Sequence, residues 1–190
     1  MELMSSIKLS AEEKETCHKV ASDSIRYGLE YGTQIPVSSS DYSQALQQKY
    51  ATFVTLHKNG NLRGCIGALE AYQPLINDVA EHAFAAAFSD PRFPKLTEDE
   101  FEQIEIEISV LSKPERIEFK DEDDLLNNIR PGIDGLILEY GYNRGTFLPS
   151  VWEQLPEKKE FLNHLKMKAG LAAQWWDNEV NISRYETLLF

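Results

Sequence analysis

One short stretch of the chain combines residues that could bind an anion or act as a nucleophile. Arg63 and Cys65 stand two positions apart, and Gly64 and Gly67 flank the cysteine in the motif LRGCIG. A nearby arginine can favour the reactive thiolate form of a cysteine. Glycine is usually avoided inside strands, so the two glycines suggest that something, such as a substrate or a partner backbone, approaches closely. The alternative is a buried cysteine that acts as a small apolar residue.

Two further residues could supply acid–base chemistry. His82 lies in an alanine-rich segment and could serve as a base or metal ligand if its helix face looks toward Cys65. A lone histidine on such a face is more often a packed, hydrogen-bonded residue. Glu105 and Glu107 share a strand face, and paired carboxylates can do acid–base work. A solvated sheet face explains Glu105 more simply, whereas the two explanations are balanced for Glu107.

A short loop bracketed by Pro91 and Pro94 contains a further charged pair. Asp90 and Arg92 could form a local ion pair that locks the loop. Alternatively, Arg92 and Arg63 could together bind a carboxylate or phosphate, because guanidinium groups bind such anions through two hydrogen bonds. Rigid loops often hold binding residues, so both interpretations remain open.

Metal and cofactor sites are not expected. The chain contains two cysteines, Cys17 and Cys65, in different predicted elements. Two thiols provide neither a disulfide framework nor a structural zinc site. No C-x-x-C or H-x-x-x-H spacing is present, and the glycine-rich segments lack the lysine and helix that complete a phosphate loop.

The overall composition indicates an acidic globular protein. The 190 residues are 42% hydrophobic and have a formal net charge of −12. This charge argues against nucleic-acid binding, which depends on clustered cations. No apolar run approaches the roughly 18 residues that a membrane span needs. The N-terminal segment Met1–Lys8 lacks the basic and apolar regions of a signal peptide, so we expect a cytoplasmic protein.

Hydrophobic periodicity and turn signals indicate the elements that must position these residues. Helices are predicted over residues 11–31, 74–88, 121–129 and 157–169. Strands are predicted over residues 50–57, 62–69, 101–111, 116–119, 135–140, 146–148 and 180–185. Because hairpins alternate with helices, we expect an α+β fold with mainly antiparallel sheets and flanking helices. We expect one domain over residues 1–190, which could consist of two lobes that share a core.

The register of the first hairpin decides which side chains share a face with Cys65. Asn59–Gly60 is typical of a two-residue type I′ turn, and this turn predicts that Val54 pairs with Cys65. Side chains alternate along a strand, so Cys65 and Val54 would share one face while His57 lies on the other. In that register His57 cannot be the base for Cys65, although a bulge near the glycines would undo the argument.

Several segments together carry a family resemblance. They are LRGCIG at 62–67, DPRFP at 90–94, EISVLS at 107–112, GLIL at 135–138, GTFLP at 145–149 and KAGL at 168–171. With these segments in this order, the chain resembles the AMMECR family. It is especially similar to the bacterial and archaeal members called AmmeMemoRadiSam system protein A.

The resemblance implies a two-lobed α+β fold with antiparallel sheets. It also implies that a Memo-like protein and a radical-SAM protein are the partners, because the three are encoded or fused together. It implies no particular reaction. The chain departs from the family pattern at Lys95, where a second proline often follows Pro94, and at Lys166, where many members carry a cysteine.

Two functions remain open from the sequence. The first is an accessory or scaffold protein that binds its partners through the face carrying Arg63, Cys65 and the loop 90–94. The second is a thiol-dependent enzyme in which Cys65 is the nucleophile and His82 or Glu107 the base. In the enzyme, Arg63 and Arg92 would bind an anionic small molecule. We favour the first, because no complete set of nucleophile, base and orienting group is visible.

Overall fold

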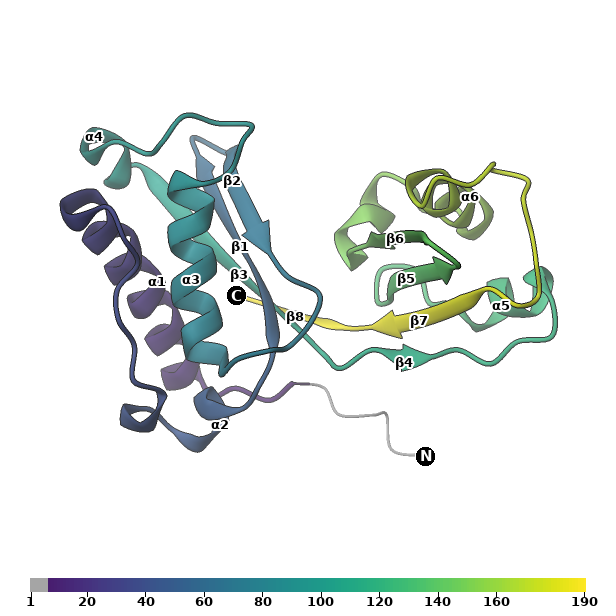
Figure 1. Cartoon of the computed structure of the whole chain (residues 1–190), viewed down its shortest axis with the longest axis horizontal. Helices are drawn as coiled ribbons and strands as arrows, with labels where there is room; N and C mark the ends of the chain where they lie inside the picture. The colour runs from purple at the N-terminus through teal and green to yellow at the C-terminus, as the bar shows by residue number, and fades with distance from the viewer. Residues whose placement is uncertain (1–6) are drawn as a thin grey trace. The chain divides into compact units, whose positions relative to one another are not determined.

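The computed structural model describes residues 7–190 and divides into two compact units (Figure 1). The first unit comprises the chain up to Ser112 together with Leu188–Phe190, and the second comprises Lys113–Thr187. The prediction drawn from the N-terminal segment rests mainly on residues 1–6, which lie outside the described residues. Among the helices of residues 7–190, none is both long enough and apolar enough to cross a membrane.

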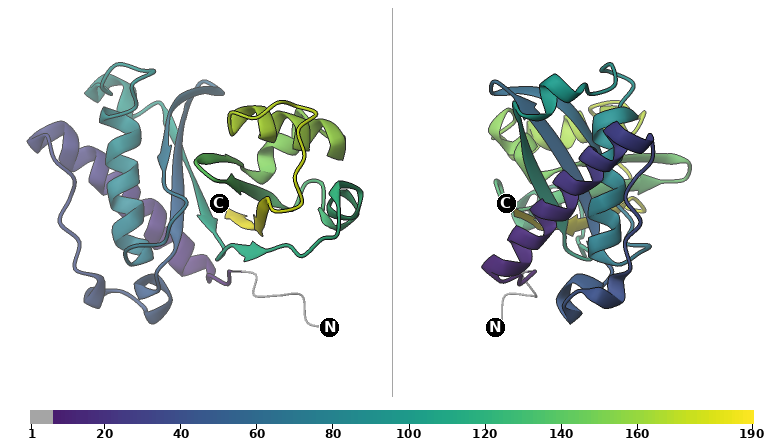
Figure 2. Two further views of the ribbon diagram at one scale, coloured as in Figure 1. Left: turned by 45° about the vertical axis from the view of Figure 1, so that its right-hand side comes forward. Right: turned by 90° about the vertical axis from the view of Figure 1, so that its left-hand side faces the viewer.

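The first unit is a sheet with helices packed on one face (Figure 2). Its sheet has the strand order β2-β1-β3-β8. Its elements are α1 (Ala11–Tyr31), η1 (Ser39–Asp41), α2 (Gln44–Gln47), β1 (Ala51–Lys58), β2 (Asn61–Gly67), α3 (Leu75–Phe88), α4 (Glu98–Phe101), β3 (Ile104–Leu111) and β8 (Thr187–Leu189).

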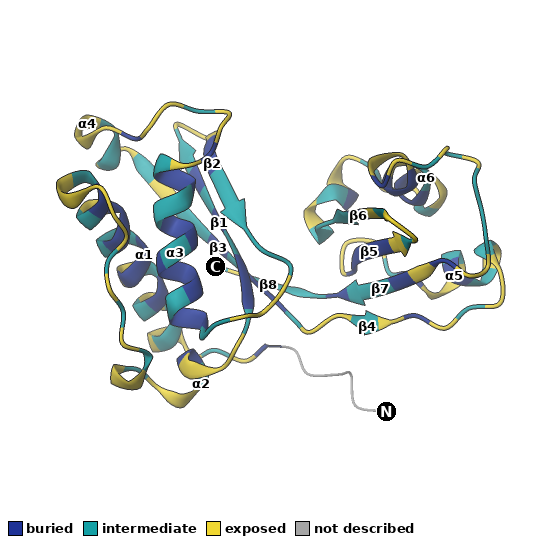
Figure 3. Ribbon diagram, in the orientation of Figure 1, coloured by how far each residue is buried: buried dark blue, intermediate teal, exposed yellow. Residues whose placement is uncertain are grey.

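Helix α1 begins and ends at local signals. The Ser10 side chain accepts a hydrogen bond from the backbone N–H of Glu13. The Glu13 carboxylate in turn accepts one from the backbone N–H of Ser10, so the two residues form a capping box. Gly32 ends the helix in the left-handed conformation, with φ of 73°. The buried faces of α1 and α3 are dark blue in Figure 3, and they form one core with Val54 and Ile108 of the sheet.

The second unit has its own sheet and core. Its strand order is β4-β7-β5-β6. Within its core, the Trp152 and Phe161 rings stack with centroids 3.7 Å apart. Its elements are β4 (Glu115–Arg116), α5 (Glu122–Asn128), β5 (Gly135–Tyr140), β6 (Asn143–Phe147), η2 (Pro149–Glu153), α6 (Lys158–Lys168) and β7 (Asn181–Tyr185).

The predicted α+β class with mainly antiparallel sheets is confirmed. The second hairpin differs from its prediction, because β6 begins at Asn143 and leaves a turn of only Gly141–Tyr142. Strand β8 was not predicted, since three residues show no clear alternation and the strand exists through pairing with β3. Helix α4 was also missed, although Thr97 and Glu100 form a capping box.

Candidate functional site

Strand β2 contains a bulge that changes the predicted register. The pairing with β1 shifts by one residue at Arg63, which has no partner on that strand. Beyond the bulge, Cys65 pairs with Thr55, whereas the sequence-based register paired it with Val54. That prediction is wrong, because the turn determines the register only as far as the bulge. Cys65 shares a face with Thr55 and His57, so the register no longer excludes His57.

Cys65, Thr55 and Glu107 form one row across the sheet. The Thr55 hydroxyl donates a hydrogen bond to Cys65 Sγ over 3.2 Å. Thr55 is paired with Glu107 of β3 on its other side. Cys65 and Glu107 therefore lie on the same face but two strands apart, about 9.5 Å in the hydrogen-bonding direction. The carboxylate is placed on the right face for Cys65 but not within direct reach of it.

His82 lies on the opposite side of the sheet from Cys65. Its Nδ1 is 3.0 Å from the Thr52 hydroxyl and 3.1 Å from Asp78 Oδ2. Thr52 points to the same face of β1 as Val54, two residues further on, and the Val54 side chain lies in the core beneath the helices. The structure therefore places His82 in a buried polar network with Thr52 and Asp78. It does not bring His82 to the thiol.

The loop from Asp90 to Pro94 closes over the outer edge of β2, the end strand of its sheet. Asp90 Oδ2 accepts the backbone N–H of Cys65 at 2.9 Å, and Arg92 donates a long hydrogen bond of 3.4 Å to the Cys65 carbonyl. These side chains take the place of a neighbouring strand and cap the exposed edge. Arg92 also donates to both Asp90 oxygens, at 3.0 and 2.7 Å. The two residues thus form the local pair that locks the loop.

Arg63 connects the bulge in β2 to the segment that follows the loop from Asp90 to Pro94. Its Nε and Nη2 donate to the two Glu100 oxygens at 3.1 and 2.9 Å, and Nη2 also donates to the Pro94 carbonyl at 2.9 Å. Arg63 and Arg92 both lie against the Phe93 ring, 5.9 and 5.5 Å from its centroid. Buried Nη1 of Arg63 has no hydrogen-bond partner among residues 7–190. An external anion would have to compete with carboxylates that both guanidinium groups already bind.

The electrostatics of the site favour permanently ionised carboxylates. The hydrogen bonds from Arg92 hold the pKa of Asp90 far below its usual range, although burial acts in the opposite direction. Hydrogen bonds from Arg63 lower the pKa of Glu100 to about 2, again against the effect of burial. A general base works best with a pKa near the operating pH. Neither carboxylate therefore suits acid–base catalysis near neutral pH.

The glycines of the motif allow close contacts within the protein itself. A Cβ atom on Gly64 would lie 2.1 Å from the carbonyl oxygen of Ala86 in α3. A Cβ atom on Gly67 would lie 2.3 Å from the Thr52 carbonyl and 2.4 Å from the Phe53 ring. The close approach predicted from the sequence therefore exists, but the approaching groups belong to α3 and β1. The glycines by themselves indicate no external ligand.

Three residues of this site were not found from the sequence: Thr55, Phe93 and Glu100. Glu100 had a detectable signal, the capping box with Thr97, but not one that pointed to Arg63. Thr55 had no local signal, because its contact with the thiol depends on the bulge. Within the described residues, no group of three or more His, Cys, Asp or Glu side chains could hold a metal ion.

The two cysteines differ sharply in their surroundings. Cys17 is fully buried in α1, and burial raises the pKa of its thiol to about 12. Cys65 is only partly buried, on the sheet face away from the helices. A reagent added to the folded protein should therefore react with Cys65 in preference to Cys17.

In the second unit, Lys166 is fully buried and forms an ion pair with Glu122. It also donates to the Ala173 carbonyl at 3.3 Å and lies 5.5 Å from the centroid of the Trp176 ring. Lys159 binds the other Glu122 oxygen at 2.7 Å. Lys166 therefore connects α6 to α5 and to the segment that contains the paired tryptophans.

Comparisons with known proteins agree with this architecture. A model of the AMMECR1 family matches residues 18–190. A protein of Methanothermobacter thermautotrophicus is 39% identical over 184 residues, which cover 96% of this chain and 95% of the relative. Protein MJ0810 of Methanocaldococcus jannaschii is 41% identical over 84% of this chain and 80% of its own length. The crystal structure of uncharacterized protein PH0010 from Pyrococcus horikoshii aligns with a TM-score of 0.85 and 31% identity, covering 95% of this chain and 92% of that one.

Proposed function

Because this chain belongs to the AMMECR1 family, we propose that it acts in the cytoplasm as an accessory protein that binds a Memo-like protein and a radical-SAM protein. The binding surface is the outer face of β2 together with the loop from Asp90 to Pro94. One observation supports this function above others. The polar groups of the LRGCIG motif and of the loop bind one another, and so build a rigid surface rather than a reaction centre.

A rigid surface favours association because little conformational entropy is lost when a partner binds. Asp90 and Arg92 hold the loop against β2, while Arg63 holds the segment at Pro94 and Glu100. Leu62 lies on the same face as Cys65, since it pairs with His57, and its side chain is 42% exposed. This exposed leucine supplies the apolar contact that a docking surface needs.

The arrangement around Cys65 gives less support to catalysis. Its side-chain neighbour Thr55 donates a hydrogen bond to Sγ, and no base among residues 7–190 is hydrogen-bonded to the thiol. His82 is bound to Thr52 and Asp78 on the other side of the sheet. A nucleophile normally has a base within hydrogen-bond reach, itself oriented by a third group. That set is incomplete here.

Co-elution with each purified partner tests the proposal, and isothermal titration then measures the affinity. The proposal predicts a complex at micromolar concentration, weakened at least ten-fold by Leu62→Asp. The matched control is Tyr142→Asp, which places the same charge on a fully exposed side chain in the second unit. Cys65→Ser should bind like the wild type. Failure of the wild-type protein to bind either partner would contradict the proposal.

A thiol-dependent enzyme that uses Cys65, with Arg63 and Arg92 binding an anionic small molecule, is the second candidate. The hydrogen bond from the Thr55 hydroxyl to Sγ favours it, because such a donor can stabilise negative charge on sulfur. Alkylation of the folded protein as a function of pH, in a Cys17→Ala background, tests this function. Rapid alkylation that persists below pH 7 would support the enzyme, since the thiolate is the reactive form. A slow, flat profile would favour the accessory role.

A further inference from the structure

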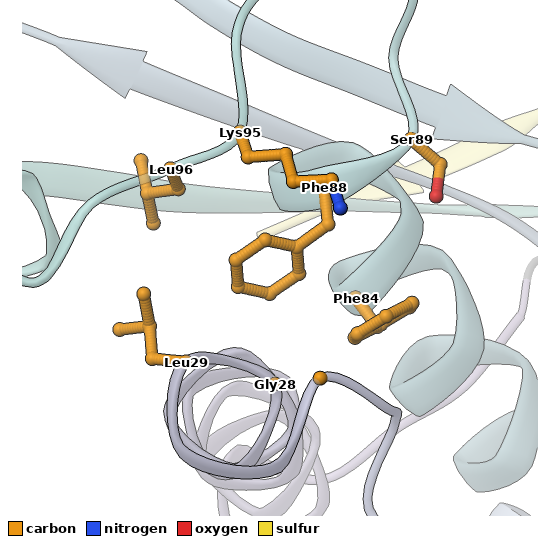
Figure 4. A pocket seen from close by; sticks show the side chains of 8 residues that line it. Gly28, Leu29, Phe84, Phe88, Ser89, Lys95 and Leu96 are labelled. Atoms are coloured by element: carbon orange, nitrogen blue, oxygen red, sulfur yellow. The ribbon is translucent and has the colours of Figure 1, made fainter.

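A cavity of about 290 Å³ lies in the first unit between the C-terminal ends of α1 and α3 (Figure 4). A third wall comes from Lys95 and Leu96, which follow the loop that caps β2. Its volume is at the lower end of the range of small-molecule sites, about 300–1,000 Å³. The accessory role proposed above does not use this cavity.

Two glycines at the C-terminal end of α1 shape the cavity. A Cβ atom on Gly28 would lie 2.4 Å from the Phe88 ring and 2.8 Å from the Phe84 ring, so both rings rest directly on the α1 backbone. Gly32 turns the chain away with φ of 73°, and no atom lies within 4 Å of the position of its Cβ. The Leu96 N–H donates to the Ala87 carbonyl at 2.9 Å and holds the third wall in place. These contacts belong to the fold, so the cavity is present without a ligand.

The lining combines an apolar body with one cationic end. Its apolar side chains come from α1, from α3 and from Leu96, with the Phe88 ring at the centre of the view in Figure 4. Its polar groups are the Lys95 ammonium and the Ser89 hydroxyl. Within residues 7–190, neither group has a hydrogen bond or ion pair with another side chain. Both side chains are exposed, and Lys95 has no acidic partner there although the chain contains 31 acidic residues.

We propose that this cavity binds a small monocarboxylate with an aromatic or branched aliphatic body. The carboxylate would bind Lys95 and Ser89, and the body would pack against Phe88 and Leu29. A neutral ligand would gain no charge–charge attraction from the ammonium, and a cation would be repelled by it. The C-terminal ends of α1 and α3 add partial negative charge. This charge opposes any anion, but it opposes a phosphate dianion more strongly than a singly charged carboxylate, for which one lysine is a sufficient counter-charge.

The competing explanation is that Lys95 interacts only with the negative ends of the two helices. Lysines near helix C-termini are stabilising in general. On that explanation the lysine contributes to folding stability and selects no ligand. The two explanations differ in whether Lys95 discriminates a carboxylate from its neutral analogue.

Titration of the ¹⁵N-labelled protein with phenylacetate and with neutral phenylacetamide separates them. The expected result is a set of saturable shifts at the amides of Ser89, Lys95 and Leu96, with phenylacetate at least five-fold tighter. Lys95→Gln should reduce this preference below two-fold. The matched control, Lys120→Gln, removes an exposed lysine of the second unit and should keep the preference.

Three results would overturn the proposal: shifts that do not saturate, equal affinity for the two probes, or a preference that survives Lys95→Gln. A Lys95→Gln protein that is less stable but binds phenylacetate as the wild type does would leave only the helix-end explanation. Because the probes and the measured amides do not involve Leu62 or the proposed partners, failure here leaves the accessory role untouched.

Discussion

Two loops of the molecule are locked by the same local arrangement of an arginine and an aspartate. In the first unit, Arg92 binds the Asp90 carboxylate through its backbone N–H and its guanidinium. In the second unit, Arg130 binds the Asp134 carboxylate in the same two ways. Both aspartates are buried, which makes each pair part of the folded loop rather than a loose surface contact.

The loops differ in what else the aspartate carboxylate binds. Within the part of the chain that the structure describes, the Asp134 carboxylate binds only Arg130, which also reaches Glu186 over 2.9 Å. The Asp90 carboxylate additionally accepts the N–H of Cys65, 25 positions earlier in the chain. The local pair therefore indicates a rigid loop in both places. The long-range hydrogen bond to an edge strand is what makes the first loop part of a candidate binding surface.

The largest expected effect on stability comes from replacing one glycine of each region by alanine. In Gly64→Ala the new Cβ meets the Ala86 backbone at 2.1 Å, which should cost about 3 kcal/mol of unfolding free energy because the helix must move. Gly132, in the loop between Arg130 and Asp134, has φ of 76° and open space around it. Its replacement by alanine should cost about 1 kcal/mol, from backbone strain alone.

The two units can be followed separately during urea unfolding. All three tryptophans, Trp152, Trp175 and Trp176, lie in the second unit, so their fluorescence reports that unit. Hydrogen exchange of the α3 amides reports the first unit. Equal costs for the two alanine variants would show that α3 accommodates the extra methyl group and that Gly64 is not required for close packing.

Removal of each aspartate should distinguish the two loops. Asp90→Ala and Asp134→Ala should each cost about 2 kcal/mol, because each leaves a partly exposed arginine without its main partner. Only Asp90→Ala should speed exchange of the Cys65 amide. We expect about ten-fold or more, since a hydrogen bond to a charged group contributes about 1.5–3 kcal/mol. A Cys65 amide that exchanges equally in both variants would remove the distinction between the loops.

A fall in pH should lower the stability of the first unit, because folding lowers the pKa of its hydrogen-bonded carboxylates. The folded pKa of Glu100 is about 2, below its unfolded value of about 4.3. A lowered folded pKa adds stability above the unfolded pKa, and this stability is lost as pH falls from about 5 to about 2. The stability difference between the wild type and Glu100→Gln, measured by α3 amide exchange, should therefore shrink across this window. Glu102→Gln, at an exposed glutamate of the first unit, is the control and should show no such trend.

The smallest expected effect comes from exchanging arginine for lysine, which keeps the charge but loses the two-pronged geometry. Arg92 has a side chain that is 55% exposed, against 33% for Arg130. Arg92→Lys should therefore cost about 0.5 kcal/mol and Arg130→Lys about 1 kcal/mol, since exposed pairs contribute less. The urea midpoints of the two units measure this. The reverse order would show that the capping of β2, rather than exposure, sets the energy of the pair.

Much of the fold could be predicted because its signals are local. The capping box at Ser10 and the left-handed Gly32 bound α1 through contacts within a few residues. The Asn59–Gly60 turn has positive φ at both positions, 50° and 77°, as a type I′ turn requires. Such features depend on backbone conformation and near neighbours, so the amino-acid pattern is sufficient to predict them.

The candidate site was only partly predictable. The motif and the loop from Asp90 to Pro94 were identified as a region, and the local Asp–Arg pair was one of the two interpretations. The fact that Asp90 caps β2 at Cys65 was not foreseen, because 25 residues separate the two in the chain. The sequence also offers His82 as a base for the thiol, although its ring binds Thr52 of β1 and Asp78 of α3, on the helix side of the sheet.

The sequence alone specified the four longer helices, the Asn59–Gly60 turn and the family, whereas the folded chain decided which way Cys65 faces. One extra residue at Arg63 reverses the alternation of side chains beyond it. The bulge is held by Glu100 and by the contact of Gly64 with Ala86, groups more than 20 positions away. Alternation within a strand has a period of two, so a single distant contact is enough to move the thiol from one face of the sheet to the other.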